Sequence, residues 1–373
     1  MIEKIHIKNF KSIYDLEIEV GRVNLFIGEN GSGKSNLLEA LVFVSASDSN
    51  KLDNEFLVSR GLRVPEPTLM RSAFKEENKN DEISIDIFFN KGSNTYLLYN
   101  ENTIYSNWID HHSILRDEYP QFKNMSTEEK KKIKNGNSYI QKFLLNVSET
   151  PKHKFENFII FSPENTALRV FEKEGQIQPL GINGEGLLKL LKVINNYDDK
   201  TYIQTVIKSL QLFNWFEEIK IPTDLKSNEN KIVIKDKYLY QEFDQRSANE
   251  GFLFILFYIT LIVAKETPKA FAIDNIDASL NPKLCTKLMT ILTELAIKYD
   301  KQIFLTTHNP AILDGIDLND EEQKLFVVSR NKQGHTRMKE MKSKDNPLDE
   351  DGEAINLSEA FLRGYLGGLP DGF

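Results

Sequence analysis

Eight residues near the start of the chain have the types and the spacing of a phosphate-binding loop. Gly28-Glu29-Asn30-Gly31-Ser32-Gly33-Lys34-Ser35 matches G-x-x-x-x-G-K-S at every fixed position. Glycines let the backbone wrap around phosphates, so that N–H groups point inward where a helix begins. In this pattern the lysine reaches the β- and γ-phosphates, and the next hydroxyl ligates Mg²⁺. The motif predicts that a nucleoside triphosphate binds to Asn30, Gly31, Ser32, Gly33, Lys34, Ser35 and Asn36.

The elements around this loop are the ones that the motif needs. Residues 23–27 form an apolar run of β type, and residues 36–43 have helical spacing. Strand, glycine loop and helix together separate a phosphate loop from an accidental glycine-rich turn.

Polar side chains follow two later apolar runs. Asp274 ends the run at 270–273, and His308 ends the run at 302–307. The carboxyl ends of parallel strands meet at one edge of a sheet, so both side chains should lie beside the phosphate loop. A carboxylate at this place would hold Mg²⁺ directly or through water, which makes Asp274 a candidate metal ligand with Ser35.

This ordered set of motifs resembles the RecF/SMC-like branch of the ABC-type ATPases, in the AAA15/AAA21 group. The resemblance is carried by Ile7-Lys8-Asn9-Phe10-Lys11-Ser12-Ile13, by the phosphate loop, by 270–274 and by Ser279-Leu280-Asn281-Pro282. It implies an α/β fold, an ABC-type ATPase head (a P-loop NTPase) with a mixed central sheet, an antiparallel β-lobe and a helical insertion. The expected domains are an N-terminal ATPase lobe at 1–100, a helical, locally basic insertion at 101–157 and a C-terminal ATPase lobe at 158–373.

The resemblance gives further residues a role at the nucleotide. Lys11 and Ser12 become accessory contacts, with an ordinary polar turn as the alternative. Ser247, Asn249 and Gly251 stand where the family has its signature motif, at the start of a helix that faces the γ-phosphate held by the other subunit. A plain helix N-cap is the alternative there. His308 becomes the switch histidine that contacts the γ-phosphate.

Two positions depart from the family pattern. The residue after the Walker B aspartate is Asn275, where relatives carry the glutamate that polarises the attacking water. Hydrolysis is then slow, uses Asp277, or awaits a partner, and the expected catalytic set is Asp274, Asn275, Asp277 and His308. The loop after 158–161 carries no glutamine, so Glu164 or Asn165 would substitute, with Glu164 as a metal ligand.

Composition limits the class of protein. The 373 residues carry a net charge of −8, unlike a protein that coats DNA. Cys285 is the only cysteine, which excludes an internal disulfide. The longest apolar run, 252–264, is shorter than the ~20 residues that span a bilayer, so we expect a buried helix and no membrane association. The single cysteine fits a reducing cytosol, so we expect a cytoplasmic location.

The segment from Gln121 to Lys154 differs from the rest in charge. It contains eight lysines and three glutamates, which gives +5. It predicts either a contact surface for DNA or a partner protein, or a solvated helical insertion. Other local patterns predict strands at 83–89 and 95–99, an amphipathic helix at 201–219 and a hairpin of strands at 231–234 and 238–240.

The resemblance implies an ATPase that uses ATP and Mg²⁺ in a head-to-tail homodimer. Each site would take Lys34 and Asp274 from one chain and Ser247 from the other. The first hypothesis is a sensor or regulator of bacterial antiviral defence with a separately encoded effector, such as a nuclease or toxin, because the sequence shows no nuclease constellation of its own. The alternatives are a RecF-like DNA repair or recombination ATPase and a nucleotide-gated scaffold with little hydrolysis.

Overall fold

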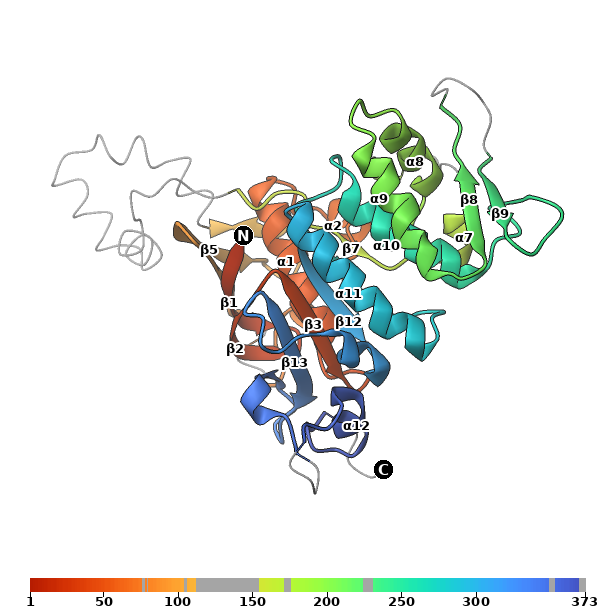
Figure 1. Ribbon diagram of the computed structural model, residues 1–373. Helices are drawn as coiled ribbons and strands as arrows, with labels where there is room; N and C mark the ends of the chain where they lie inside the picture. Colours follow the sequence, from red (N-terminus) through yellow and green to blue (C-terminus); the bar gives the residue numbers. More distant parts are fainter. Residues whose placement is uncertain are drawn as a thin grey trace.

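We describe the protein from a computed structural model (Figure 1). The structure describes residues 1–75, 78, 80–103, 106–111, 154–170, 176–223, 231–348 and 353–368. The basic segment from Gln121 to Lys154, apart from Lys154 itself, lies outside these residues.

A six-stranded mixed sheet forms the centre of the molecule. Its strand order is β14-β13-β3-β12-β11-β7, and only the edge strand β14 runs antiparallel to its neighbour. Successive side chains of a strand point to opposite faces, so the apolar runs supply two cores. The bounds are β3 Val23–Gly28, β7 Ile160–Phe161, β11 Ala270–Ile273, β12 Gln302–Thr307, β13 Gln323–Arg330 and β14 Thr336–Met341.

One face of this sheet is covered by helices. Helices α10 (Glu250–Val263) and α11 (Pro282–Lys298) lie on this face (Figure 1). Val23, Leu25 and Ile27 of β3 share a core with them. Every residue of α10 from 252 to 263 is buried, as expected of a helix that is apolar all round. No helix within the described residues is long and apolar enough to cross a membrane.

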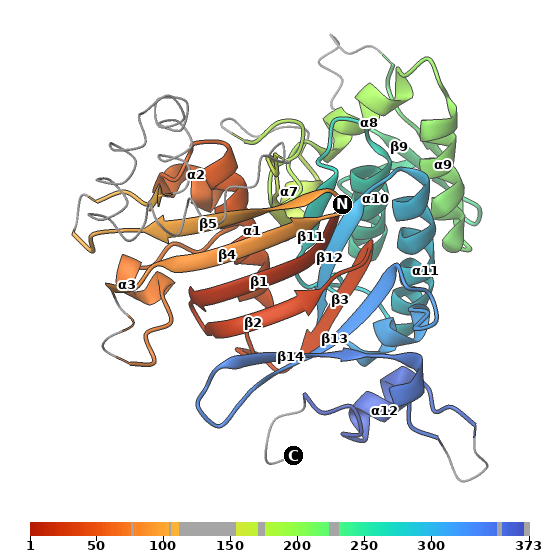
Figure 2. The same ribbon diagram turned by 90° about the vertical axis from the view of Figure 1, so that its left-hand side faces the viewer.

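The other face of the sheet packs against α1 and an antiparallel sheet. Helix α1 spans Lys34–Asp48, and Phe26 of β3 shares its core. The antiparallel sheet has the order β2-β1-β4-β5-β6 and lies across α1 (Figure 2). Its strands are β1 Ile2–Phe10, β2 Ile13–Glu19, β4 Ile83–Phe89, β5 Gly92–Tyr99 and β6 Ile109–Asp110. The short helices α2 (Asn54–Ser59) and α3 (Pro67–Met70) connect α1 to this sheet.

A smaller lobe precedes α10 and corrects one sequence prediction. The helix predicted at 201–219 ends early: α9 spans Thr201–Ser209, a 3-10 turn follows at Leu210–Leu212, and Phe216–Lys220 is strand β8. Phe213, Trp215 and Phe216 all pack against Phe252 of α10. This aromatic packing ends the helix early, although the apolar residues continue at helical spacing. The lobe also contains α7 (Asn165–Leu168) and α8 (Leu187–Asn195).

The predicted hairpin is correct in its first strand only. Strand β9 spans Val233–Asp236 and pairs with β8 on one side and with β10 (Phe243–Asp244) on the other. Tyr238, Leu239 and Tyr240, predicted as the second strand, lie in the exposed turn between β9 and β10. Because their side chains have no core to pack against, their β-type composition does not produce a strand.

The C-terminal part returns to the phosphate loop. A 3-10 helix, η3 (Pro310–Gly315), follows β12 and contacts α12 (Leu357–Leu362). The Ser358 hydroxyl donates to the Asp314 carboxylate at 2.6 Å. Beyond α12, Gly368 lies so near β3 that a Cβ there would stand 3.7 Å from the Gly28 Cα.

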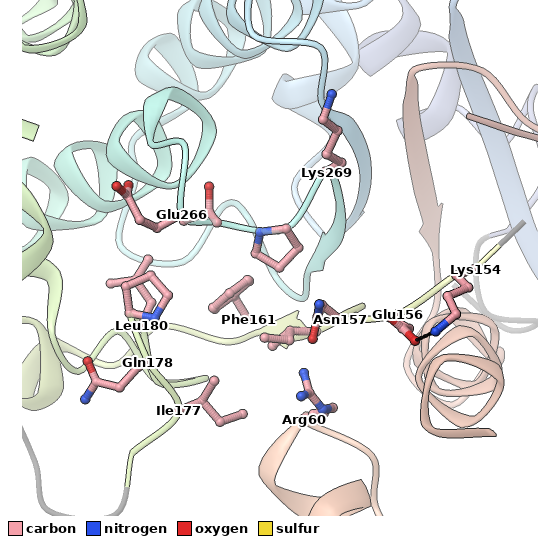
Figure 3. A pocket seen from close by; sticks show the side chains of 14 residues that line it. Arg60, Lys154, Glu156, Asn157, Phe161, Ile177, Gln178, Leu180, Glu266 and Lys269 are labelled. Atoms are coloured by element: carbon pink, nitrogen blue, oxygen red, sulfur yellow. Dashed lines mark hydrogen bonds and ion pairs between the residues drawn. The ribbon is translucent and has the colours of Figure 1, made fainter. Parts of the chain in front are cut away.

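A cavity of about 620 Å³ lies at the amino ends of β7 and β11 (Figure 3). Arg60, Asn157 and Lys269 are among its lining residues. This edge of the sheet is opposite to the phosphate loop, which follows the carboxyl end of β3. Ligands of open α/β sheets bind at the carboxyl ends, so this cavity is not the nucleotide site.

Candidate nucleotide-binding site

The phosphate loop joins β3 directly to the first turn of α1. Gly28 and Gly33 have φ of 156° and 108°, which other residues rarely adopt. A Cβ on Gly28 would stand 2.1 Å from the Val328 carbonyl oxygen, and one on Gly33 would stand 2.1 Å from the Thr336 hydroxyl. Gly33 is the N-cap of α1 and offers no side-chain cap. The first N–H groups of α1 therefore face the loop uncapped by a side chain, as an anion site requires.

Lys34 is the buried cation of this loop. Its ammonium donates to the carbonyl oxygens of Gly28 at 2.8 Å and Glu29 at 3.0 Å. Burial lowers the pKa of Lys34 to about 8, although Asp274, Asp277 and Glu29 partly oppose the shift. A polyphosphate beside the ammonium would raise this pKa again, because an opposite charge favours the charged form.

The predicted metal ligands meet across the sheet. The Ser35 hydroxyl lies 3.1 and 3.3 Å from the two carboxylate oxygens of Asp274. The Thr306 hydroxyl of β12 donates to the same carboxylate and fixes its orientation. No group of three or more His, Cys, Asp or Glu side chains that could hold a metal occurs among the described residues. A hydroxyl and one carboxylate, with the remaining positions left to water and phosphates, fit Mg²⁺.

The other predicted catalytic residues follow β11 and β12. Asn275 is exposed, has a φ of 57° and donates its backbone N–H to the Thr306 hydroxyl at 2.9 Å. The Asp277 carboxylate accepts from the Thr307 hydroxyl at 2.6 Å and from the backbone N–H of His308 at 3.2 Å. Partial burial, with the Lys34 charge, lowers the pKa of His308, so its ring is neutral at pH 7.

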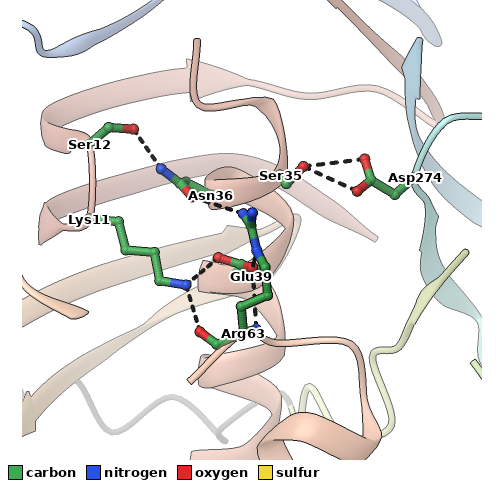
Figure 4. A network of polar contacts seen from close by, with 7 residues as sticks. All are labelled: Lys11, Ser12, Ser35, Asn36, Glu39, Arg63 and Asp274. Atoms are coloured by element: carbon green, nitrogen blue, oxygen red, sulfur yellow. Dashed lines mark hydrogen bonds and ion pairs between the residues drawn. The ribbon is translucent and has the colours of Figure 1, made fainter. Parts of the chain in front are cut away.

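A second polar network lies on the Asn36 side of the loop (Figure 4). The Asn36 amide donates to the Ser12 hydroxyl at 2.6 Å. Lys11 follows Phe10 in a turn between β1 and β2, and its ammonium lies 2.5 Å from the Glu39 carboxylate. The Arg63 Nε donates to that carboxylate at 2.6 Å. Lys11 and Ser12 thus lie in an organised cluster beside the phosphate loop.

A cavity of about 520 Å³ opens between this cluster and β13. It carries cations and apolar side chains but no carboxylate among its described lining, which suits a phosphorylated nucleoside. Its lining residues are Lys11, Ser12, Asn36, Arg63, Val64, Pro65, Leu69, Arg71, Ala73, Phe74 and Arg330.

The predicted signature residues precede α10. The N-cap is Asn249, whose side chain accepts from the Phe252 N–H at 2.7 Å, and Ser247 is exposed before it. Gly251 lies within the first turn, and a Cβ there would stand 3.1 Å from the Ser279 carbonyl oxygen. Arg169 fixes the loop by donating to the carbonyl oxygens of Gln245, Arg246 and Ala248 at 2.7 to 2.8 Å.

The loop after β7 holds the last predicted ligand. Glu164 is exposed and is the N-cap residue of α7, with its backbone N–H bonded to the Asn183 carbonyl oxygen at 2.9 Å. β7 pairs with β11, so this loop and Asp274 share one edge of the sheet. No hydrogen bond within the described residues joins Glu164 to Ser35 or Asp274. The side-chain oxygen of Asn165 accepts a hydrogen bond from the Arg169 Nε at 2.9 Å.

Several residues of the site were not predicted from the sequence. Thr306 and Glu39 had detectable signals: a hydroxyl in a strand end, and a carboxylate within the apolar run of α1. Arg63, Arg330 and Thr336 had none, because they reach the loop from segments distant in sequence. The Arg330 Nε donates to the Gly31 carbonyl oxygen at 2.7 Å, and the Thr336 hydroxyl donates to that of Ser32 at 2.8 Å.

Comparison with known sequences finds partial relatives. Residues 23–314 match the family described as "AAA domain, putative AbiEii toxin, Type IV TA system". An uncharacterized protein of Methanocaldococcus jannaschii is 35% identical over 113 residues, 29% of this chain and 50% of that protein. DNA replication and repair protein RecF of Porphyromonas gingivalis is 33% identical over 113 residues, 30% of each chain. RecF of Listeria welshimeri is 40% identical over 55 residues, 14% of this chain and 15% of that protein. The chain thus matches half or less of these relatives' length.

Comparison with solved structures shows the fold over nearly the whole chain. An Smc head bound to the C-winged helix domain of ScpA superposes with a TM-score of 0.57 at 15% identity, covering 92% of this chain and 98% of that one. The Smc head with an extended coiled coil, bound to the C-terminal domain of ScpA from Pyrococcus furiosus, gives 0.52 at 13% identity, covering 92% and 97%. The predicted fold class, an α/β head with a mixed central sheet and an antiparallel lobe, is confirmed.

Proposed function

The chain belongs to this AAA domain family, within the RecF/SMC-like group of ABC-type ATPases, and from that premise we propose that it binds ATP with Mg²⁺ and hydrolyses it in a head-to-tail homodimer. The observation that carries the proposal is the approach of the Ser35 hydroxyl to the Asp274 carboxylate at 3.1 Å, beside the buried Lys34. The loop with its lysine and the carboxylate come from two distant parts of the sequence and meet at one edge of the sheet.

Each group at this edge has a task in the proposed reaction. The N–H groups at the start of α1 and the Lys34 ammonium would bind the β- and γ-phosphates. Ser35 and Asp274 would hold Mg²⁺, which neutralises phosphate charge when bound. His308, neutral and next to Asp277, would donate a hydrogen bond to the γ-phosphate. Lys11, Ser12 and Asn36 would meet the nucleoside side of the ligand in the adjoining cavity.

We propose a dimer because the described residues of one chain bring only the phosphate loop to the γ-phosphate. A second set of N–H donors for that phosphate would come from another chain. Ser247 and the first turn of α10 are exposed, and α10 is long enough to present a helix dipole to an anion. In a head-to-tail dimer this helix end would meet the γ-phosphate bound to the partner. The lobes at 1–100 and 158–373 would then act as the two halves of one head, joined by the insertion at 101–157.

We propose slow turnover, because an amide cannot act as a general base. Asn275 can only orient water by hydrogen bonds, and Asp277 is engaged with Thr307 and the His308 backbone. Removing general-base assistance costs about 10²- to 10⁴-fold in rate. Glu164 stays a candidate metal ligand from the neighbouring loop.

The proposed biological role is that of a sensor or regulator in antiviral defence, with a separately encoded nuclease or toxin as effector. Two observations support it: the matching family's description names a toxin of a toxin–antitoxin system, and the described residues contain no cluster of metal-binding side chains for a nuclease of their own. The similarity to RecF favours a second candidate, a DNA repair ATPase, with the segment from Gln121 to Lys154 as its DNA contact. A scaffold gated by nucleotide is the third, motivated by Asn275.

The binding proposal is tested by titrating the protein with ATP and Mg²⁺ in a calorimeter, with Lys34→Ala as the variant that should lose binding. Sedimentation with ATP should show a dimer that Ser247→Arg abolishes without loss of ATP binding. An unaltered dimer in Ser247→Arg would refute the sandwich.

The three roles separate in further measurements. Copurification with the products of neighbouring genes should yield an effector if the defence role is right. Replacement of Lys130, Lys131 and Lys132 by glutamate should abolish DNA binding only if the protein is a RecF-like ATPase. Sustained multiple turnover by the purified complex would exclude the scaffold.

A further inference from the structure

Glu39 is a buried carboxylate on the first helix after the phosphate loop. It is 1% exposed, and its neighbours Leu37, Leu38, Ala40 and Leu41 are fully buried. Glutamate is almost never buried unless it is paired, so its presence in this apolar run needs a partner. The partners are two cations from different segments: Lys11 of the turn between β1 and β2, and Arg63 of the segment after α2.

The contacts form a closed arrangement (Figure 4). One carboxylate oxygen of Glu39 lies 2.5 Å from the Lys11 ammonium, and the other lies 2.6 Å from the Arg63 Nε and 3.3 Å from the Arg63 backbone N–H. The Lys11 ammonium also donates to the Arg63 carbonyl oxygen at 2.8 Å. Glu39 thereby fixes one cation to the other as well as to α1.

Glu39, Lys11 and Arg63 together carry more positive charge than is needed to neutralise one buried carboxylate. A single cation would neutralise Glu39, and the second leaves the group of three at net +1. That excess faces the cavity beside Asn36, which both cations line. The Arg63 side chain is 71% exposed although its Nε is held, and its Nη2 lies 3.5 Å from the Asn36 side-chain oxygen. The donors of Arg63 that Glu39 does not use are therefore accessible from the cavity.

We propose that Glu39 is a positioning residue that holds Lys11 and Arg63 as a paired cation clamp for the nucleoside and α-phosphate part of the nucleotide. This inference rests on the proposed nucleotide site and deepens it. The clamp lies on the Asn36 side of the loop, whereas Asp274 contacts the loop at Ser35 (Figure 4). It therefore contributes equally to ATP and ADP and does not sense the γ-phosphate.

Charge and position predict opposite results when Glu39 is neutralised. Glu39→Gln keeps the size of the side chain and removes a negative charge near a polyphosphate, so Coulomb's law alone predicts tighter binding. Positioning predicts weaker binding, because the amide offers one oxygen to two cations, so its NH2 group would face either Lys11 or Arg63 and release that cation. Since charged hydrogen bonds are the strong ones, we expect the Kd of ATP and of ADP to rise about tenfold each.

The test measures the Kd of ATP and ADP by calorimetry, and the KM and kcat of ATP hydrolysis, for wild type and Glu39→Gln. A positioning role in binding raises KM and leaves kcat unchanged, because the interaction is equal in ground and transition states. Glu66→Gln is the matched control: Glu66 is an exposed carboxylate at the start of α3 without a contact to Lys11 or Arg63 among the described hydrogen bonds. It removes the same charge and should leave Kd unchanged.

A double-mutant cycle separates positioning from general stability. In a Lys11→Met/Arg63→Met background, Glu39→Gln should cause no further rise in Kd, whereas a merely structural role would still weaken binding. If Glu39→Gln fails to fold, Lys11→Met and Arg63→Met carry the test, and each must weaken ATP and ADP by the same factor. Unchanged or tighter ATP binding by Glu39→Gln would refute the cation clamp and leave the proposed ATP site intact. Absence of ATP binding by the wild type would refute the proposed function itself.

Discussion

The buried ammonium of Lys34 should make nucleotide binding depend on pH in a defined window. Its pKa is about 8 in the free protein, and bound phosphates raise it. Binding therefore favours the protonated form, so affinity is full below pH 8 and falls as the pH rises above it. At pH 7 about nine-tenths of the molecules carry the proton, and at pH 9 about one-tenth do, which predicts an affinity about tenfold weaker at pH 9.

Other titrating groups do not produce the same curve. A phosphate monoester has a second pKa of about 6, so about nine-tenths of the nucleotide is fully ionised at pH 7 and nearly all of it at pH 8 and above. The pKa of His308 is lowered, and its ring stays neutral from pH 7 upward. Lys301 also has a pKa of about 8, but it caps the far end of α10. It titrates alike in the free and bound protein, so it makes no contribution to the pH dependence of ATP binding.

The assay is calorimetry of ATP binding from pH 7 to pH 9.5, in two buffers of different ionisation enthalpy at each pH. Near pH 8 the protein should take up about half a proton for each ATP bound. The pKa of Lys11 is also lowered by burial, so Lys11→Arg, which retains the charge but does not titrate in this range, is the control. Affinity that stays flat to pH 9.5, without proton uptake, would show that Lys34 is charged throughout and refute the reasoning.

Three further outcomes are expected. Asn275→Glu should raise multiple turnover of ATP at least about tenfold by restoring a general base, and cost about 1 kcal/mol in the free energy of unfolding, because its φ of 57° suits asparagine better. Gly28→Ala places a Cβ 2.1 Å from the Val328 carbonyl oxygen, so denaturant unfolding should show a loss of about 2 kcal/mol, and ATP titration a loss of binding. Lys301→Met removes the donor to the carbonyl oxygens of Ala264, Thr267 and Pro268, so it should cost about 2–3 kcal/mol in the same unfolding assay and leave the Kd of ATP unchanged.

The sequence predicted the inner strands of the central sheet and the residues of the candidate site that follow them, because their signals are local. The phosphate loop, the strand before Asp274 and the strand before His308 each have a pattern within ten residues. Parallel pairing then brings their carboxyl ends to one edge. What the sequence could not show is contact between distant segments: the salt bridges of Glu39, and the bond from Arg330 of β13 to Gly31, depend on how two sheets stack around α1.

The wrong helix at 201–219 has the same origin. Helical spacing of apolar residues continues through Phe213, but whether a chain follows its spacing depends on which surface is available to the side chains. Here α10 offers Phe252, and Trp215 and Phe216 pack on it best from a strand and its preceding turn. Local periodicity carries no information about that aromatic surface, which is contributed by residues some forty positions later.

Asn275 has two physical consequences, and only one of them can be inferred from the sequence. In the sequence, Asn275 stands where a glutamate that acts as general base is expected. In the structure it also occupies a left-handed backbone position, with φ of 57°, where its N–H is bonded to the Thr306 hydroxyl that orients Asp274. Asparagine tolerates this conformation better than glutamate does. An asparagine that lacks a base thus suits the turn that orients the candidate metal ligand, and we expect binding of ATP and its hydrolysis to be separable properties of this site.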